Sequence, residues 1–138
     1  MKYKLLWIIT LLMIIIVGVF MYFKLSGLGT YEKIDIYTAN NFDKAVNTPI
    51  LSINDEKTLK EISVILKESK KIHGKLDVAS PDYIMDIYNN KNVQTVYLWV
   101  RKDNVQGMFM YKDNTGTGYT ISKTDTDKLK KLILTTNK

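Results

Sequence analysis

The fold of the chain is decided by residues 82–100, DYIMDIYNNKNVQTVYLWV. Apolar and polar residues alternate along 82–88 and again along 93–100, which is typical of strands with one buried face. Between them, Asn89-Asn90-Lys91-Asn92 is rich in residues that favour turns. The segment therefore predicts an antiparallel hairpin.

More strands are expected on both sides of this hairpin. Tyr31 to Thr38 alternates, and Ile50 to Ile53 follows Pro49 as a short strand. Gly107 to Tyr111 and Thr117 to Ile121 predict a second hairpin, with its turn at 112–116. The polar stretch 39–48 is expected to be a loop.

Two segments predict amphipathic helices. Asn54-Asp55 supplies a cap, and apolar residues then recur at helical spacing toward Lys71. Ser122 and Asp125 form a capping box before a second apolar stripe at positions 129, 132 and 133. The expected order from position 30 is β-β-α-β-β-β-β-α. This predicts an α+β domain, residues 30–138, with a mainly antiparallel sheet and both amphipathic helices packed on one face.

An uncharged run, Leu5 to Phe23, precedes this domain. As a helix it would be about 28 Å long, close to the hydrocarbon thickness of a bilayer. The sequence therefore predicts an N-terminal transmembrane helix, with residues 1–29 forming a cytoplasmic stub, an anchor and a short linker. A cleaved signal peptide is the alternative, although its apolar region is usually shorter.

Charge around the run predicts its orientation. Lys2 and Lys4 precede it and only Lys24 follows closely, so the N-terminus is expected in the cytoplasm and the domain outside a cell membrane crossed once. The predicted partners are the lipid bilayer, through Leu5 to Phe23, and an envelope polymer or another extracytoplasmic protein domain.

Overall composition excludes some classes of function. The net charge is +6, and the domain after the run is only mildly basic, with scattered lysines. A nucleic-acid binder usually has a clustered basic stripe, so no nucleic-acid partner is expected. The chain has no cysteine. Lipoprotein processing, which requires a cysteine just after the apolar run, is therefore excluded, and the domain is predicted to have no disulfides.

Groups that could carry catalysis are few. The one histidine, His73, precedes Gly74 at a predicted helix end, where a polar cap is the commoner role. Ser69 and Ser80 do not lie in a nucleophile-elbow sequence. No glycine loop for a nucleotide is present. The sequence therefore predicts no enzyme, no catalytic residue and no cofactor.

Acidic residues near His73 raise the question of a metal. Asp82 and Asp86 share strand parity, and Asp77 precedes them. Hard cations usually take several oxygen ligands from one loop, and no such set is present. No metal site is therefore predicted.

Aromatic residues give the strongest indication of a binding surface. In the strand 93–100 the aliphatic residues fall on one face, which should meet the helices, and this leaves Tyr97 and Trp99 on the other. With Tyr83 and Asp82 from the neighbouring strand, they form the predicted ligand- or partner-binding site. The alternative is that these aromatic side chains simply fill the core.

Several short motifs carry a family resemblance. They are Pro81-Asp82-Tyr83, Tyr97-Leu98-Trp99, Gly107 and Tyr119-Thr120-Ile121-Ser122. Over Lys70 to Leu134 the chain resembles small extracytoplasmic domains of lipoproteins and membrane-anchored proteins of Bacillus-type, Gram-positive bacteria. Members are largely of unknown function, so the resemblance implies a location and a fold. Unlike the lipoprotein members, this chain lacks the lipid-bearing cysteine.

Together these observations predict a membrane-anchored extracytoplasmic binding or interaction domain. Two alternatives remain open. One is an envelope-acting hydrolase with its acid near Asp82, and the other is a structural subunit of a membrane complex.

Overall fold

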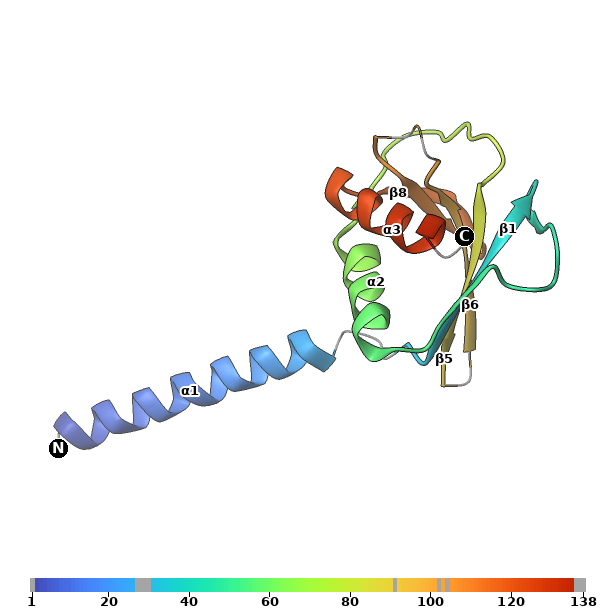
Figure 1. Cartoon of the computed structure of the whole chain (residues 1–138). Helices are drawn as coiled ribbons and strands as arrows, with labels where there is room; N and C mark the ends of the chain where they lie inside the picture. Colours follow the sequence, from blue (N-terminus) through green and yellow to red (C-terminus); the bar gives the residue numbers. More distant parts are fainter. Residues whose placement is uncertain (1, 27–30, 91, 102, 104, 136–138) are drawn as a thin grey trace.

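The computed structural model describes residues 2–26, 31–90, 92–101, 103 and 105–135, and within the first of these ranges the side chains of residues 7–21. An antiparallel sheet carries two helices, α2 and α3, on one face (Figure 1). Helix α1, Lys2–Ser26, lies apart from them in the same view. The predicted α+β class with an antiparallel sheet is confirmed.

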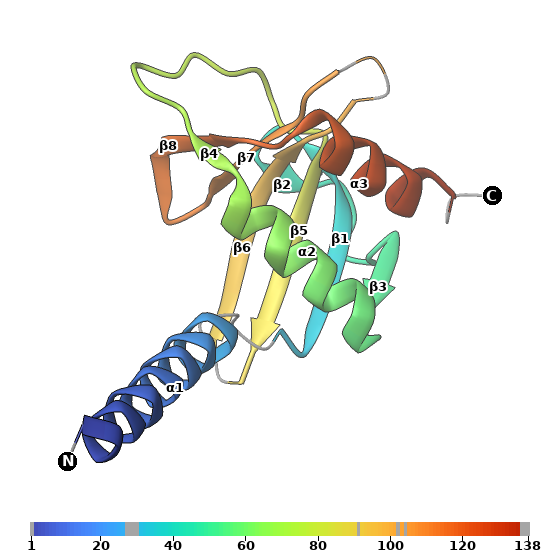
Figure 2. The ribbon, with the colours of Figure 1, turned by 90° about the vertical axis from the view of Figure 1, so that its left-hand side faces the viewer.

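The sheet curls, as Figure 2 shows, and has eight strands in the described part of the chain. They are β1 (Lys33–Asn40), β2 (Asp43–Lys44), β3 (Leu51–Ile53), β4 (Lys70–Lys71), β5 (Tyr83–Asn89), β6 (Asn92–Trp99), β7 (Met108–Tyr111) and β8 (Asn114–Thr120). Their order is β2-β1-β5-β6-β7-β8-β4, and β3 pairs with the first half of β1. Strands β5 and β6 therefore lie near the middle.

The central hairpin forms as its sequence predicts. Asn89 is opposite Asn92, so the turn is tight. Asn90 in this turn has a φ of 47°, a left-handed conformation that asparagine adopts more readily than most residues. The turn fixes the register in which Tyr83 faces Leu98 and Asp86 faces Thr95.

Strand alternation gives the sheet two faces. The inner face packs against α2 and α3 through aliphatic residues and Phe109. Its fully buried strand residues are Ile34, Ile36, Met85, Ile87, Val96, Leu98 and Phe109. The outer face carries a second, smaller apolar cluster of Tyr37, Ile84, Tyr97, Trp99 and Met110. The sheet is thus covered on both sides.

Both covering helices begin at the predicted caps. In α2 (Glu56–Glu68) the Asp55 carboxylate accepts a hydrogen bond from the Thr58 amide at 2.9 Å. In α3 (Lys123–Thr135) the Asp125 amide donates to Ser122 Oγ at 3.1 Å, and that hydroxyl donates to the Asp125 carboxylate at 2.7 Å. Helix α2 buries Leu59, Ile62, Ile65 and Leu66, and α3 buries Leu129 and Ile133.

The order of elements differs from the expected one by two short strands. Strand β2 lies in the stretch 39–48, which was expected to be a loop, and β4 follows the end of α2. Each has two residues and pairs at an edge, β2 with β1 and β4 with β8. A strand of two residues is too short to show an alternating pattern in the sequence. Strands β2 and β4 therefore form because they pair with β1 and β8, and the sequence gives no local signal for them.

The prediction of a transmembrane helix at Leu5 to Phe23 is corrected. In the described part of the chain, no helix is both long enough and apolar enough to cross a membrane. A span needs about 20 apolar residues, and the side chains of α1 are described only from Trp7 to Met21. The predicted single-pass cell-membrane placement, with a cytoplasmic N-terminus and an outer domain, is corrected with it. The predicted linker after Ser26 lies outside the described residues.

Candidate functional site

Two carboxylates lie side by side on the outer face of the sheet. Asp35 on β1 is opposite Asp86 on β5, and Asp86 is in turn opposite Thr95 on β6. Asp35 is 3% exposed and Asp86 is 5% exposed. Charged groups are rarely buried this far without partners, so the groups around them define the site.

Lys44 and Thr95 hold Asp86. The Lys44 ammonium lies 2.5 Å from Asp86 Oδ2, and the Thr95 hydroxyl donates to Asp86 Oδ1 at 2.8 Å. The same ammonium lies 3.9 Å from the centre of the Tyr37 ring. Burial works to lower the pKa of Lys44, but the hydrogen bond and negative charge of Asp86 outweigh it and raise that pKa. Lys44 is therefore charged at neutral pH.

Asp35 has its own set of partners. The Ser52 hydroxyl donates to it at 2.6 Å, and the Lys33 ammonium lies 2.7 Å from it. Burial works to raise the pKa of Asp35, but the hydrogen bonds from Lys33, Ser52 and Tyr88 together lower it. Burial and the nearby negative charge raise the pKa of Tyr88 to about 12. The Asp35 carboxylate is therefore a structural anion, and its hydrogen bonds are made to residues of the strands around it.

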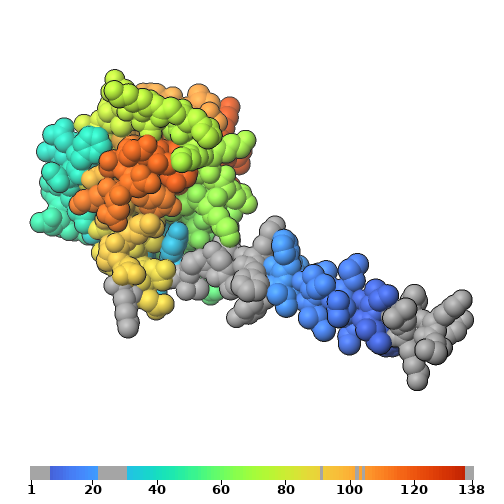
Figure 3. All heavy atoms as spheres, turned by 180° about the vertical axis from the view of Figure 1, so that it is seen from behind, coloured from blue at the N-terminus to red at the C-terminus, as the bar shows by residue number. Residues whose placement is uncertain are grey.

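A cleft opens above Asp86 and has a volume of about 310 Å³. We call it the outer cleft. Ile84, Asp86, Thr95 and Tyr97 from the sheet form its base, the 42–47 segment forms one wall and Lys112 lines the other side. From behind, Figure 3 shows the teal β1–β3 connection beside the orange hairpin that joins β7 and β8.

Phe42 gives the outer cleft an aromatic wall. Its ring meets the Tyr97 ring edge to face, with centroids 5.2 Å apart and planes at 83°. Phe42 is 41% exposed, whereas Tyr97 is 6% exposed. The cleft thus combines one accessible ring with a fixed carboxylate, an ammonium and a hydroxyl, which suits hydrogen bonding to a polar molecule.

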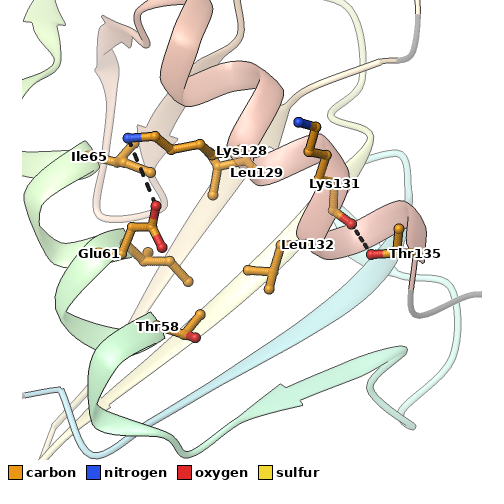
Figure 4. A pocket seen from close by; sticks show the side chains of 9 residues that line it. Thr58, Glu61, Ile65, Lys128, Leu129, Lys131, Leu132 and Thr135 are labelled. Carbon is orange, nitrogen blue, oxygen red and sulfur yellow. Dashed lines mark hydrogen bonds and ion pairs between the residues drawn. The ribbon is translucent and has the colours of Figure 1, made fainter.

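A second hollow lies between α2 and α3 and has a volume of about 360 Å³ (Figure 4). Ile62, Ile65 and Leu129 line it but are each at most 3% exposed. Leu132, which is half-buried, is the apolar lining residue that a ligand could still cover, but the charged groups of this hollow, Glu61 and Lys128, are about half exposed, unlike the buried Asp86 of the outer cleft. The Lys128 ammonium also approaches Glu61 across the hollow at 3.9 Å. The outer cleft is therefore the stronger candidate.

The four residues predicted as a binding site do not all lie together: Asp82 and Tyr83 line a hollow beside Arg101, whereas Tyr97 lines the outer cleft. Tyr97 and Trp99 share the outer face, but Trp99 is 7% exposed and its indole N–H donates to the Ala79 carbonyl at 2.9 Å. Leu76 and Val78 pack on the same cluster. Tyr83 packs instead with the inner core. Of the four, Tyr97 alone lines the outer cleft.

Asp82 lies just before β5 and braces the end of β6. Its carboxylate accepts from the Val100 amide at 3.0 Å and from Arg101 Nε at 2.6 Å. A carboxylate with a backbone donor and a guanidinium partner is well suited to holding chain segments together. His73 is exposed on the segment between β4 and β5.

Sequence reasoning missed Lys44, Phe42 and Lys112, and it considered Asp86 only as a metal ligand. Asp86 does carry a signal, because it interrupts the apolar outer face of β5 between Ile84 and Tyr88. Lys44 carries none, since its position over Asp86 depends on the pairing of β2 with β1.

The fold resembles a solved structure of a thioesterase-like protein from Clostridium sporogenes ATCC 15579. The TM-score is 0.58, the sequences are 23% identical, and the match covers 75% of this chain and 94% of the other. At this identity the likeness shows the fold alone. No curated protein matches the chain.

These findings also correct the predicted function. A membrane-anchored extracytoplasmic binding domain is not supported, because no helix in the described part of the chain could span a membrane.

A family model described as YhfM protein matches residues 30–138. The match includes all eight strands and both covering helices, and therefore the whole of the outer cleft. It carries no information on a lipoprotein or extracytoplasmic setting. Because the model covers most of the sequence, the chain belongs to the YhfM protein family.

Proposed function

We propose that the protein binds a small polyhydroxylated molecule, of the saccharide class, in the outer cleft. The observation that carries the proposal is the composition of the cleft: a buried Asp86 carboxylate paired with the half-buried Lys44 and with a threonine hydroxyl at the base, and the accessible Phe42 ring at the wall. Sugar hydroxyls can both donate and accept hydrogen bonds, and the C–H faces of a sugar ring pack on aromatic rings.

The base of the cleft has hydrogen-bonding capacity left over. A carboxylate offers about four lone-pair sites, and the Lys44 and Thr95 bonds occupy two of those on Asp86. An ammonium has three donors, and Asp86 takes one from Lys44. Donors and acceptors thus stand within a few ångströms of each other in fixed positions, as a hydroxyl-bearing ligand requires.

Binding without chemical turnover fits this geometry better than catalysis. A general base must be within reach of the proton that it takes up, whereas the Asp86 carboxylate is buried and paired with Lys44 at 2.5 Å. His73 does not line the cleft. We therefore extend the proposal to a domain that recognises its ligand and leaves it intact.

Calorimetric titration of the purified full-length chain with glucose, galactose, N-acetylglucosamine and their disaccharides tests the proposal. We expect at least one to bind, and we expect Phe42→Ala and Thr95→Val each to weaken binding. Thr95→Val keeps the side-chain shape and removes the hydroxyl. Asp127→Asn, an exposed change on α3, is the control. Absence of heat with every sugar, or equal binding by all the variants, would overturn the proposal.

Thioester hydrolysis is a second candidate, favoured by the fold likeness to a thioesterase-like protein. In this reaction water adds to the thioester carbonyl, the C–S bond breaks, and a carboxylic acid and a thiol are released. Release of free thiol from acetyl-CoA, above a protein-free control and lost in Asp86→Asn, would replace the binding proposal with this one. An inactive but folded Asp86→Asn protein is required, so circular dichroism accompanies the assay.

A further inference from the structure

The base of the outer cleft continues along β6 into the outer apolar cluster. Thr95, Tyr97 and Trp99 share the outer face of this strand and follow one another at intervals of two residues. Two residues of a strand span about 7 Å. Thr95 and Tyr97 line the cleft, whereas Trp99 does not. The polar base of the cleft therefore lies one side chain away from a buried tryptophan ring.

A segment without regular secondary structure, residues 73–81, covers this tryptophan. We call it the strap, and Figure 3 shows it in yellow-green along the upper part of the view. Leu76 and Val78 of the strap are half-buried and pack on the outer apolar cluster. The Trp99 indole N–H donates to the Ala79 carbonyl at 2.9 Å. The strap thus closes the apolar end of the outer face.

Few interactions hold the strap in place. Both of its flanks are fixed, because the Ile72 and Asp82 amides donate to carbonyls of the sheet at 2.8 and 3.0 Å. Between them, no backbone-to-backbone hydrogen bond joins positions 73–81 to another described residue. Apart from the indole bond, the Ser80 hydroxyl donates to the Asn41 side chain at 3.3 Å. A segment with fixed ends and few contacts between them opens locally at a low cost in free energy.

Resting on the proposed function, we infer that the strap is a lid and that the ligand is a glycoside with an apolar aglycone. The sugar ring lies against Phe42 in the outer cleft, and the aglycone follows β6 under the lifted strap and packs on Trp99. Two carboxylates and two ammonium groups line the cleft, so their charges balance, which suits an uncharged ligand. Alkyl and aryl aglycones share this chemistry and are the two sources.

The test varies the aglycone on one sugar. The full-length chain is titrated by calorimetry with methyl, butyl, hexyl and phenyl β-glucosides, each below its micelle concentration, and with the matching galactosides. Each methylene that leaves water is worth about four-fold in affinity. We therefore expect affinity to rise from methyl to hexyl by up to about four-fold per methylene. Comparing the hexyl and phenyl forms identifies the favoured aglycone, and hexanol shows what the chain binds without a sugar.

Two matched tryptophan variants assign the effect to the strap. Trp99→Phe keeps a ring under the strap and removes the hydrogen bond to Ala79. One hydrogen bond changes an equilibrium about five-fold, so the strap should be open about five times more often and the hexyl glucoside should bind about five-fold more tightly. The methyl glucoside should bind as before. Trp7→Phe makes the same change at an 80% exposed position of α1 and should alter neither affinity. Val78→Ala, which trims the strap itself, should act like Trp99→Phe.

The outcomes separate the inference from the proposal beneath it. Methyl glycosides that bind as tightly as the hexyl and phenyl forms overturn the inference and leave the proposed function standing. A preference for the hexyl form that neither Trp99→Phe nor Val78→Ala changes also overturns it, because the alkyl group then binds elsewhere, for example on the exposed apolar side chains of α1. If hexanol binds as tightly as the hexyl glycosides, or if no glycoside binds, the proposed function is overturned and the inference falls with it.

Discussion

Replacing Trp99 by alanine tests whether the outer face is a second core or an open surface. Trp99 is 7% exposed, it packs with Tyr37, Ile84, Tyr97 and Met110, and its N–H reaches the Ala79 carbonyl. Truncating a buried tryptophan costs about 3–5 kcal/mol. Domains of this size have about 5–15 kcal/mol of stability in total. We therefore expect Trp99→Ala to remove a large fraction of it.

The measurement is urea unfolding of the full-length chain, followed by circular dichroism. With a slope of about 2 kcal/mol/M, the midpoint should fall by about 2 M. Trp99→Phe keeps a ring and removes the N–H. Because Ala79 is exposed, water can replace the lost donor, and this variant should cost only about 1 kcal/mol.

Trp7→Ala is the matched control, because Trp7 is 80% exposed and should shift the midpoint very little. A cost below about 1 kcal/mol for Trp99→Ala would refute the reasoning. It would mean that the ring is not part of a packed cluster and that the open surface expected from strand alternation is present after all.

Three further predictions follow from the packing and charge of the domain. Gly107→Ala should destabilise the protein by about 1–3 kcal/mol, because a Cβ there would lie 2.8 Å from Val100 Cγ1 and 2.9 Å from the Trp99 carbonyl oxygen. Gly116→Ala is the control and should be near neutral, because the nearest atom to its Cβ would be 4.0 Å away. Thermal unfolding compares the stability of the two variants. Ser122→Ala removes the cap of α3 and should cost about 1 kcal/mol in the same assay, a cost that Ser122→Asp should largely avoid. Folding lowers the pKa of Asp35 from its ordinary value of 3.8, so its contribution to stability is present above that pH and is lost as the pH falls through the lowered value. Folding raises the pKa of Tyr88 from 10.0 to about 12, so stability should fall between those two pH values, and Tyr88→Phe should flatten that fall in urea titrations at stepped pH.

The strand pattern predicted the faces of the sheet but not what covers them. Alternation in 93–100 assigned Val96, Leu98 and Val100 to the side of the helices, and they lie there. The same alternation put Tyr97 and Trp99 on the other side, which is also where they lie. Their burial comes from a segment without a regular pattern, residues 76–79, and from Phe42 in the β1–β3 connection. Irregular segments carry no periodicity from which their path could be predicted.

The candidate site was less predictable than the fold for a related reason. Its parts come from β2, β5, β6 and the residue after β7, so they meet only once the sheet has its register. A shift of one residue would turn Asp86 to the inner face, where it would be an unpaired charge in an aliphatic core. The ion pair with Lys44 is thus tied to the register that the hairpin turn at Asn90 sets.

A carboxylate buried on a sheet face costs stability unless a cation and hydroxyls surround it, and hydrophobic residues of similar size would stabilise the face at least as well. Two such carboxylates, Asp35 and Asp86, lie opposite each other here with separate lysines and separate hydroxyls. The Asp35 set fastens β3 to β1 through Ser52 and has a structural purpose. The Asp86 set takes its lysine from β2, which pairs with β1 and not with β5, and it opens into a cleft. The Lys44–Asp86 pair thus ties β2 to β5 across β1, and under the proposed function the same pair, lying at the base of the outer cleft, also serves ligand recognition.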